Sequence, residues 1–178
     1  QENRLRKYLR HPGIVPKSEL LNWSNYSEKG DRVLDRFDKW FYSIKYDGYS
    51  AIWTGTKLVT ANGRQTVYAM PQRMQDSLTA ISTPLVGELV LVQKSDATTY
   101  ETKENLQAVV HGGRALSAKA TSVAQRLVFM VYDTPSTKLR QLTFEKRTEE
   151  LGRIVGHLNA ATDHVELVKQ YSIQENFK

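Results

Sequence analysis

Short runs of strand-forming residues, separated by turn residues, constrain the fold of this chain most strongly. Aromatic and β-branched residues are concentrated in 40–46, 49–53 and 57–61, with Asp47-Gly48 in the first gap and Thr54-Gly55-Thr56 in the second. Turn residues between runs of this length are typical of hairpins and meanders. We therefore expect an antiparallel sheet to begin at residue 40.

The rest of the chain alternates between expected helices and apolar strands. Pro71 opens a helix that ends before Pro84, a second helix covers 103–110, and Thr143 caps a third that presents Leu151, Ile154, Val155 and Leu158 on one face. Strands are expected at 85–92, 126–132 and 164–171. This order predicts an α+β fold with antiparallel β-sheets flanked by helices.

The residues before this pattern have a different character. Residues 1–38 are polar and contain Pro12, Gly13 and Pro16, which break regular structure. We expect 1–38 to form an N-terminal lead-in or linker and 39–178 to form one domain.

Composition narrows the function classes. The 178 residues include 25 Lys and Arg against 19 Asp and Glu, a net charge of +6. The positive net charge suggests a nucleic-acid partner, although a basic solvated surface would give the same composition.

Cysteine is absent, which excludes disulfides, thiolate metal sites and a cysteine nucleophile. No window approaches the ~18 apolar residues of a membrane span, and no signal peptide is recognisable. We expect an intracellular protein with no membrane partner.

Lys45 is the candidate nucleophile, because it precedes Asp47-Gly48 where one expected strand ends and the next begins. A lysine with an ordinary pKa of about 10.4 is almost wholly protonated at neutral pH, so a nucleophilic lysine needs a desolvated or cationic environment. An apolar floor could be supplied by the flanking residues Phe41, Ile44, Ile52 and Trp53. The alternative is an ordinary hairpin turn preceded by a surface lysine.

Four segments in this order resemble motifs of ATP-dependent polynucleotide ligases, and of DNA ligases most closely. They are Lys45-Tyr46-Asp47-Gly48, Thr60-Ala61-Asn62-Gly63, Val86-Gly87-Glu88-Leu89 and Phe129–Pro135. The resemblance implies the family's nucleotidyltransferase (ATP-grasp-like) adenylation domain. This domain is expected to be incomplete at its C-terminus, because the family's later Glu-Gly and Lys-x-Lys strands and its OB-fold do not follow Tyr171.

The resemblance implies an activity in DNA repair and replication. Lys45 would take AMP from ATP, pass it to the 5′-phosphate of a nick, and so prepare the nick for sealing. ATP and Mg²⁺ are the implied cofactors, and nicked duplex DNA, or an RNA-containing duplex, is the implied partner of a monomer. The alternatives are an RNA ligase, an mRNA-capping guanylyltransferase, and a nucleic-acid-binding scaffold that has lost its chemistry.

The resemblance also implies roles for single residues. Ser43 and Ile44 would read the adenine edge beside Lys45, and Tyr132 would stack on the base. Glu88 would accept a hydrogen bond from the ribose or help to hold metal-bound water, and Asp47 would lie beside the reacting phosphate and the metal. Without the resemblance, Glu88 would be an outward-facing strand charge, Tyr132 a core residue and Asp47 a turn residue.

Asn62 and Arg64 are the residues expected to contact nucleic acid. Three positions depart from the family: Ser50 and Ala61 stand where ligases usually carry arginine, and Val86 stands where they carry aspartate. Serine and alanine cannot make the bidentate phosphate contacts of arginine. We therefore expect weak joining activity from this chain alone.

Overall fold

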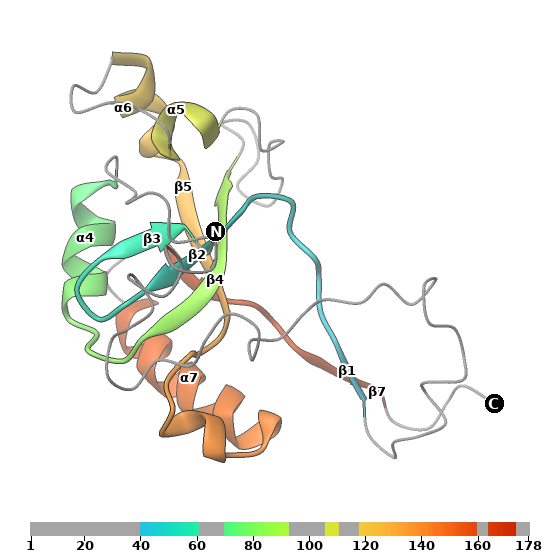
Figure 1. Ribbon diagram of the computed structural model, residues 1–178. Coiled ribbons are helices and arrows are strands. Elements are labelled where there is room, and N and C mark those ends of the chain that lie inside the picture. The colour runs from blue at the N-terminus through green and yellow to red at the C-terminus, as the bar shows by residue number, and fades with distance from the viewer. Residues whose placement is uncertain (1–39, 61–69, 93–105, 111–117, 160–163, 174–178) are drawn as a thin grey trace, which may run out of the picture. The chain divides into compact units, whose positions relative to one another are not determined.

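The computed structural model describes residues 40–60, 70–92, 106–110, 118–159 and 164–173. These residues belong to two units. One unit contains the described residues between Tyr46 and Leu167, and the other contains 40–45 and 168–173. Each unit has its own β-sheet (Figure 1). No helix of the described residues is long and apolar enough to cross a membrane.

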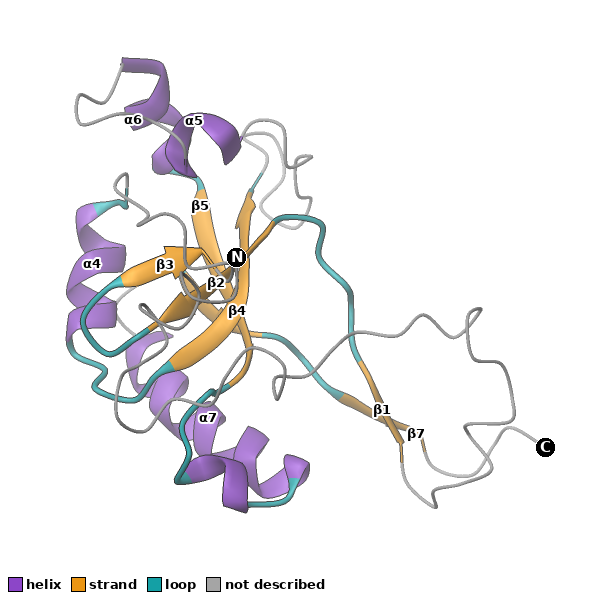
Figure 2. Cartoon of the chain, viewed as in Figure 1, coloured by secondary structure: helices purple, strands orange, loops and turns teal. Residues whose placement is uncertain are grey.

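The larger unit is built on a five-stranded sheet of order β3-β2-β4-β5-β6 (Figure 2). Its strands are β2 (Tyr49–Trp53), β3 (Leu58–Thr60), β4 (Leu85–Leu91), β5 (Leu127–Asp133) and β6 (Val165–Leu167). All neighbours are antiparallel except β5 and β6, which are parallel. The expectation of antiparallel sheets is therefore wrong at this edge, where β5 and β6 are parallel. A helix connects β5 to β6, and such a crossover returns the chain in the same direction.

The smaller unit holds a two-stranded antiparallel sheet of β1 (Trp40–Tyr42) and β7 (Tyr171–Ile173). Tyr42 lies opposite Tyr171, and their rings stack with centroids 5.1 Å apart. The Lys169 ammonium lies 5.0 Å from the centroid of the Tyr171 ring. The strand predicted at 164–171 is thus two separate strands, β6 and β7, in different sheets.

The predicted first hairpin is also wrong. Strand β1 ends at Tyr42 and pairs with β7, and residues 43–47 have no regular structure. The Gly48 N–H donates to the carboxylate of Glu88 on β4, so the turn residues Asp47 and Gly48 lead into the larger sheet. The second predicted hairpin is confirmed: β2 and β3 are joined by a turn in which Gly55 has a φ of 97°.

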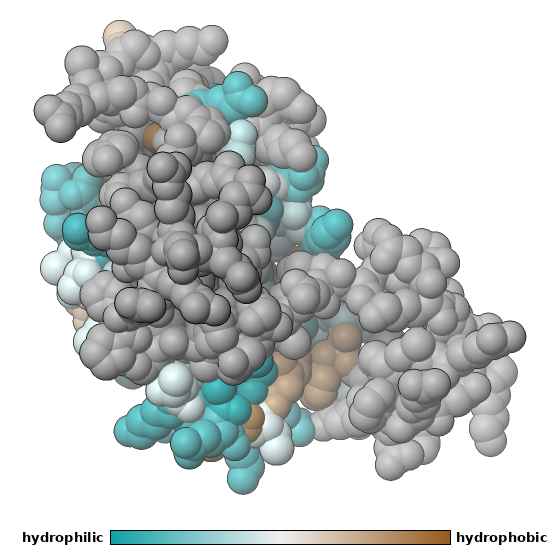
Figure 3. All heavy atoms as spheres, in the orientation of Figure 1, coloured by the Kyte–Doolittle hydropathy of each residue, from teal (hydrophilic) through white to brown (hydrophobic). Residues whose placement is uncertain are grey.

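Helices cover one face of the five-stranded sheet. The helices are α4 (Gln72–Thr79), α5 (Gln107–Val110), α6 (Ala118–Ala124), the 3-10 helix η3 (Leu139–Gln141) and α7 (Phe144–Asn159). Met74 and Leu78 of α4 and Leu151 and Val155 of α7 join Phe129 and other sheet residues in one buried core. Hydrophilic side chains cover the outer surface of α7 (Figure 3).

The helix boundaries follow the predicted signals in two cases. Pro71 directly precedes α4, and the Thr143 hydroxyl accepts a hydrogen bond from the Lys146 N–H at the start of α7 (3.4 Å). Helix α6 was not predicted, because its seven residues from Ala118 to Ala124 include only one large apolar residue, Val123. Of the helix predicted at 103–110, the described part contains α5.

Candidate active site

Glu88 is the best-defined polar group on the sheet. It lies in the middle of β4, where the residues on either side are buried. Its Oε1 accepts a hydrogen bond from the Gly48 N–H (3.1 Å), and its Oε2 accepts one from the Ser50 hydroxyl (2.9 Å). Both carboxylate oxygens are therefore bound by the short segment that follows Lys45 and Asp47.

The two motif glycines make this contact possible. A Cβ atom on Gly48 would overlap the backbone carbonyl oxygen of Leu89, and one on Gly87 would overlap that of Met130. Any larger residue would push β2 away from β4, or β4 away from β5. These glycines are required by close backbone approach, and Gly48 places its own N–H within reach of Glu88.

Three polar residues, Ser50, Glu88 and Glu166, lie in one row with the buried Met130 on the sheet face opposite the core. Ser50 lies opposite Glu88, Glu88 opposite Met130, and Met130 opposite Glu166 of β6. Residues in register on neighbouring strands share a face, so Glu166 lies on the Glu88 face, about 10 Å from Glu88 by strand spacing. Sequence reasoning missed Glu166. The available signal was its position between Val165 and Leu167, which contact the core.

Tyr132 occupies an irregular position in β5. Gly87 pairs with Val131, but Val86 pairs with Asp133, so Tyr132 is the extra residue of a β-bulge. Its side chain is 8% exposed and lies outside the core cluster that contains Val131. Bulges redirect a side chain and occur often beside active sites.

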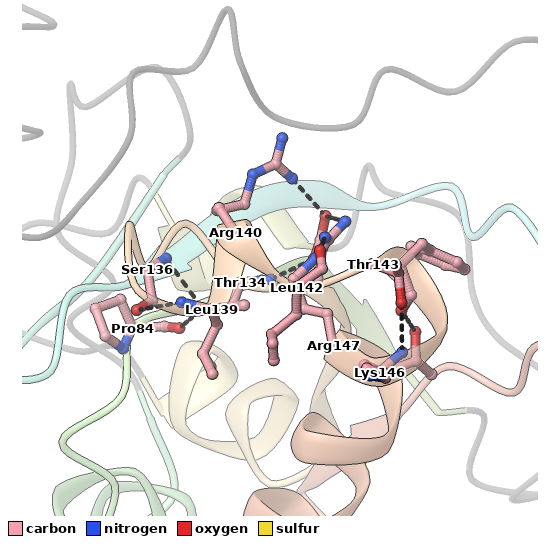
Figure 4. Close-up of polar contacts among 12 residues, drawn as sticks. Pro84, Thr134, Ser136, Leu139, Arg140, Leu142, Thr143, Lys146 and Arg147 are labelled. Atoms are coloured by element: carbon pink, nitrogen blue, oxygen red, sulfur yellow. Dashed lines mark hydrogen bonds and ion pairs between the residues drawn. The ribbon is translucent and has the colours of Figure 1, made fainter.

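The end of β5 is held by a buried ionic cluster (Figure 4). Asp133 Oδ1 accepts from Arg147 Nε (2.6 Å) and from the Thr134 N–H (2.8 Å), and its Oδ2 accepts from Arg140 Nη1 (2.9 Å). The Thr134 hydroxyl donates to the Pro84 carbonyl oxygen (2.6 Å). Sequence reasoning gave Asp133 no role. Here it joins β5 to η3 and α7.

Lys45 is exposed and lies in the segment 43–47, between β1 and β2. Ser43, Ile44 and Lys45 belong to the smaller unit, whereas Asp47 belongs to the larger one. The Ser43 hydroxyl is buried and has no hydrogen-bond partner among the described residues.

The residues expected to form an apolar floor for Lys45 differ in their exposure. Ile44 is 60% exposed, and Trp53 lies in the core, where its Nε1 donates to the Ile81 carbonyl oxygen (2.8 Å). Trp53 therefore serves the packing of β2 against the helices.

Two predictions concern residues that cannot be placed. Asn62 and Arg64 lie outside the described residues, as do Ala61 and the lead-in 1–38.

The described residues contain no group of three or more His, Cys, Asp or Glu side chains that could hold a metal ion. Mg²⁺ in nucleotide sites commonly needs only one or two carboxylates, with water and phosphate oxygens as its other ligands. Glu88 and Asp47 fit that limited requirement.

Comparisons with known proteins bear on the fold. No family model matches the chain, and no curated protein does. One similar solved structure comes from a structure–function analysis of Lig E DNA ligases, which are described as binding DNA with a minimal scaffold. It matches this chain with a TM-score of 0.53 and 21% sequence identity. The match covers 78% of this chain and 46% of that chain. The chain has a DNA-ligase-like fold.

Two further structures have the same ligase-like fold. Pmar-Lig_PreS3 matches with a TM-score of 0.57 and 14% identity, over 81% of this chain and 33% of its own length. Pmar-Lig_Pre matches with a TM-score of 0.56 and 12% identity, over 86% of this chain and 35% of its own length. At these identities the likeness concerns the fold alone. The chain spans less than half the length of each of these structures. The mixed sheet with flanking helices fits a nucleotidyltransferase-like fold.

Proposed function

We propose that this chain is the nucleotide-binding part of an ATP-dependent DNA ligase and that Lys45 accepts AMP. The observation that carries the proposal is the pair of hydrogen bonds from Gly48 and Ser50 to Glu88. They tie the one carboxylate of β4 to the segment that follows Lys45, on a ligase-like fold.

Chain connectivity supports the same grouping. Three peptide units separate Lys45 from Gly48, so their Cα atoms lie at most about 11 Å apart in any arrangement of the chain. Because Gly48 bonds to Glu88, the backbone of the candidate nucleophile Lys45 stays within this short length of chain from the candidate ribose acceptor Glu88.

The proposed reaction proceeds by covalent catalysis. The deprotonated Lys45 Nζ attacks the α-phosphorus of ATP, a P–N bond forms, and the bond to the β-phosphate breaks with loss of pyrophosphate. The 5′-phosphate of a nick then attacks the same phosphorus, the P–N bond breaks, and Lys45 is regenerated. Attack of the 3′-hydroxyl on the activated phosphate seals the strand and releases AMP.

The remaining residues would bind the nucleotide. Glu88 would accept a hydrogen bond from the ribose, and Tyr132 would stack on adenine. Ser43 and Ile44 would contact the adenine edge. Mg²⁺, when bound, would neutralise phosphate charge, with Glu88 and Asp47 accepting from its water ligands. Asn62 and Arg64 would contact the DNA.

An RNA ligase is the second candidate. Ser50 stands where DNA ligases usually carry arginine, and its hydroxyl is already bound to Glu88. A nick whose 5′-phosphate strand is RNA distinguishes the two candidates, because an RNA ligase would transfer AMP to it faster than to DNA.

Intact-mass measurement after incubation with ATP and Mg²⁺ tests the proposal. We expect one added AMP, reversed by pyrophosphate, no addition from GTP, and no addition in Lys45→Ala. Lys57→Ala, which removes another exposed lysine, should label as the unmodified chain does. Labelling that persists in Lys45→Ala would overturn the assignment of the nucleophile. An unlabelled chain that still binds nicked DNA would favour the scaffold alternative.

A further inference from the structure

The small sheet of β1 and β7 carries an exposed aromatic pair. Tyr42 lies opposite Tyr171 where the two strands run side by side (Figure 1), and the rings stack with their planes inclined by 21°. Tyr42 is nevertheless 55% exposed and Tyr171 36% exposed. Because Tyr171 covers one face of the Tyr42 ring, the exposed area of Tyr42 lies on its other face and its edges. The pair therefore presents a flat aromatic surface to solvent.

The charges near this pair have one sign. The described residues of the smaller unit, 40–45 and 168–173, include the exposed Lys45 and Lys169 and contain no Asp or Glu. The Lys169 ammonium lies 5.0 Å from the centroid of the Tyr171 ring, within the range of a cation–π contact. An aromatic surface beside a positive charge is complementary to an anion that also carries flat rings.

A single strand of nucleic acid has this chemistry. Proteins hold single strands of any sequence by stacking bases on aromatic side chains and by placing basic side chains near the phosphates. In a duplex the bases stack on one another, so a base must leave the stack before its face can contact a side chain. A protein partner fits less well, because lysine is depleted in protein–protein interfaces.

We propose that Tyr42, Tyr171 and Lys169 form a binding site for single-stranded nucleic acid. A base stacks on the exposed face of the Tyr42 ring, Tyr171 supports that ring from behind, and Lys169 contacts a phosphate. The site lies within the smaller unit. It goes beyond the proposed function, because it requires neither ATP nor the transfer of AMP to Lys45.

Fluorescence anisotropy of the full chain, measured without ATP, tests the site. The probes are a labelled oligothymidine, an abasic strand of the same length, which keeps the phosphates without the bases, and a blunt duplex. Tyr42→Leu keeps an apolar side chain without a flat ring, whereas Tyr42→Phe keeps the ring. Lys169→Ala removes the ammonium, and Lys57→Ala is its matched control, because Lys57 is an exposed lysine of the larger unit.

We expect the unmodified chain to bind oligothymidine about tenfold more tightly than the abasic strand, as one well-formed base stack provides. Tyr42→Leu should remove most of this difference, and Tyr42→Phe should keep it to within about twofold. The slope of log affinity against log salt concentration should become shallower by about 0.7 in Lys169→Ala, as expected for one phosphate contact, and should not change in Lys57→Ala.

A second measurement uses the unmodified chain, in case Tyr42→Leu unfolds the small sheet. A strand carrying 5-bromodeoxyuridine is cross-linked to the chain by ultraviolet light, and mass spectrometry identifies the attached peptides. We expect attachment to the peptides that contain Tyr42 and Tyr171.

Four results would overturn the inference. The first is equal affinity for the abasic strand and oligothymidine, and the second is cross-linking confined to the larger unit. The third is a duplex that binds as tightly as the single strand and loses as much affinity in Tyr42→Leu. The fourth is self-association that Tyr42→Leu abolishes, which would make a second copy of the chain the occupant. A chain that binds through Tyr42 but takes no AMP would contradict the proposed function alone.

Discussion

The positions of Gly48 and Gly87 require glycine, because backbone atoms of the neighbouring strand leave no room for a methyl group. Sequence reasoning identified both through their motifs, and it identified Glu88 as the one carboxylate of an apolar strand. It gave Ser50 only as a lost arginine, whereas Ser50 donates to Glu88. That contact joins residues 38 positions apart, and such a pairing follows from strand register, which local pattern does not specify.

Gly48→Ala should destabilise the protein by about 1–3 kcal/mol, because the new methyl group must displace the Leu89 carbonyl oxygen or part β2 from β4. Urea unfolding measures this. Gly156→Ala is the control, since nothing lies within 4 Å of its added methyl group and it is within α7; it should stabilise by about 0.5–1 kcal/mol. Equal stability of both variants would show that β2 does not approach β4 so closely.

At the scale of helices and strands, local signals predicted the elements and missed their partners. Strand β2 and the cap of α7 were predicted at the residues where they occur. Strand β1 pairs with β7, and β6 pairs with β5. Each pair joins segments that are distant in sequence, so no turn residue between neighbouring strands could predict the pairing. The Asp47-Gly48 pair predicted a hairpin, but its glycine amide bonds to Glu88.

The β1–β7 sheet should depend on its aromatic pair, because two strands alone are marginally stable in water. Tyr171→Ala removes the ring that stacks on Tyr42 and lies beside Lys169. We expect amide hydrogen exchange in β1 to become about two- to tenfold faster. Exchange in β4 should stay unchanged. Tyr171→Phe keeps the ring and should keep the protection; faster exchange there as well would contradict a role for stacking.

For the whole molecule, the net charge of +6 predicts how the proposed binding to DNA responds to salt. The logarithm of the association constant for nicked duplex should fall linearly with the logarithm of the salt concentration, with a slope of about −0.9 for each phosphate neutralised. Fluorescence anisotropy at several salt concentrations measures it. Affinity that does not change with salt would exclude phosphate contacts as the main source of binding.

The hydrogen bond between Gly48 and Glu88 also has a consequence for the order of folding. It closes a loop of 40 residues, and the Glu88–Met130 pairing closes another of similar length. Closing such loops costs conformational entropy before the native contacts can offset it. The Glu88 carboxylate is therefore fixed late in folding, when β2, β4 and β5 are assembled. A nucleotide held by Glu88 would bind only the completed sheet. It would therefore slow unfolding and leave the rate of folding unchanged.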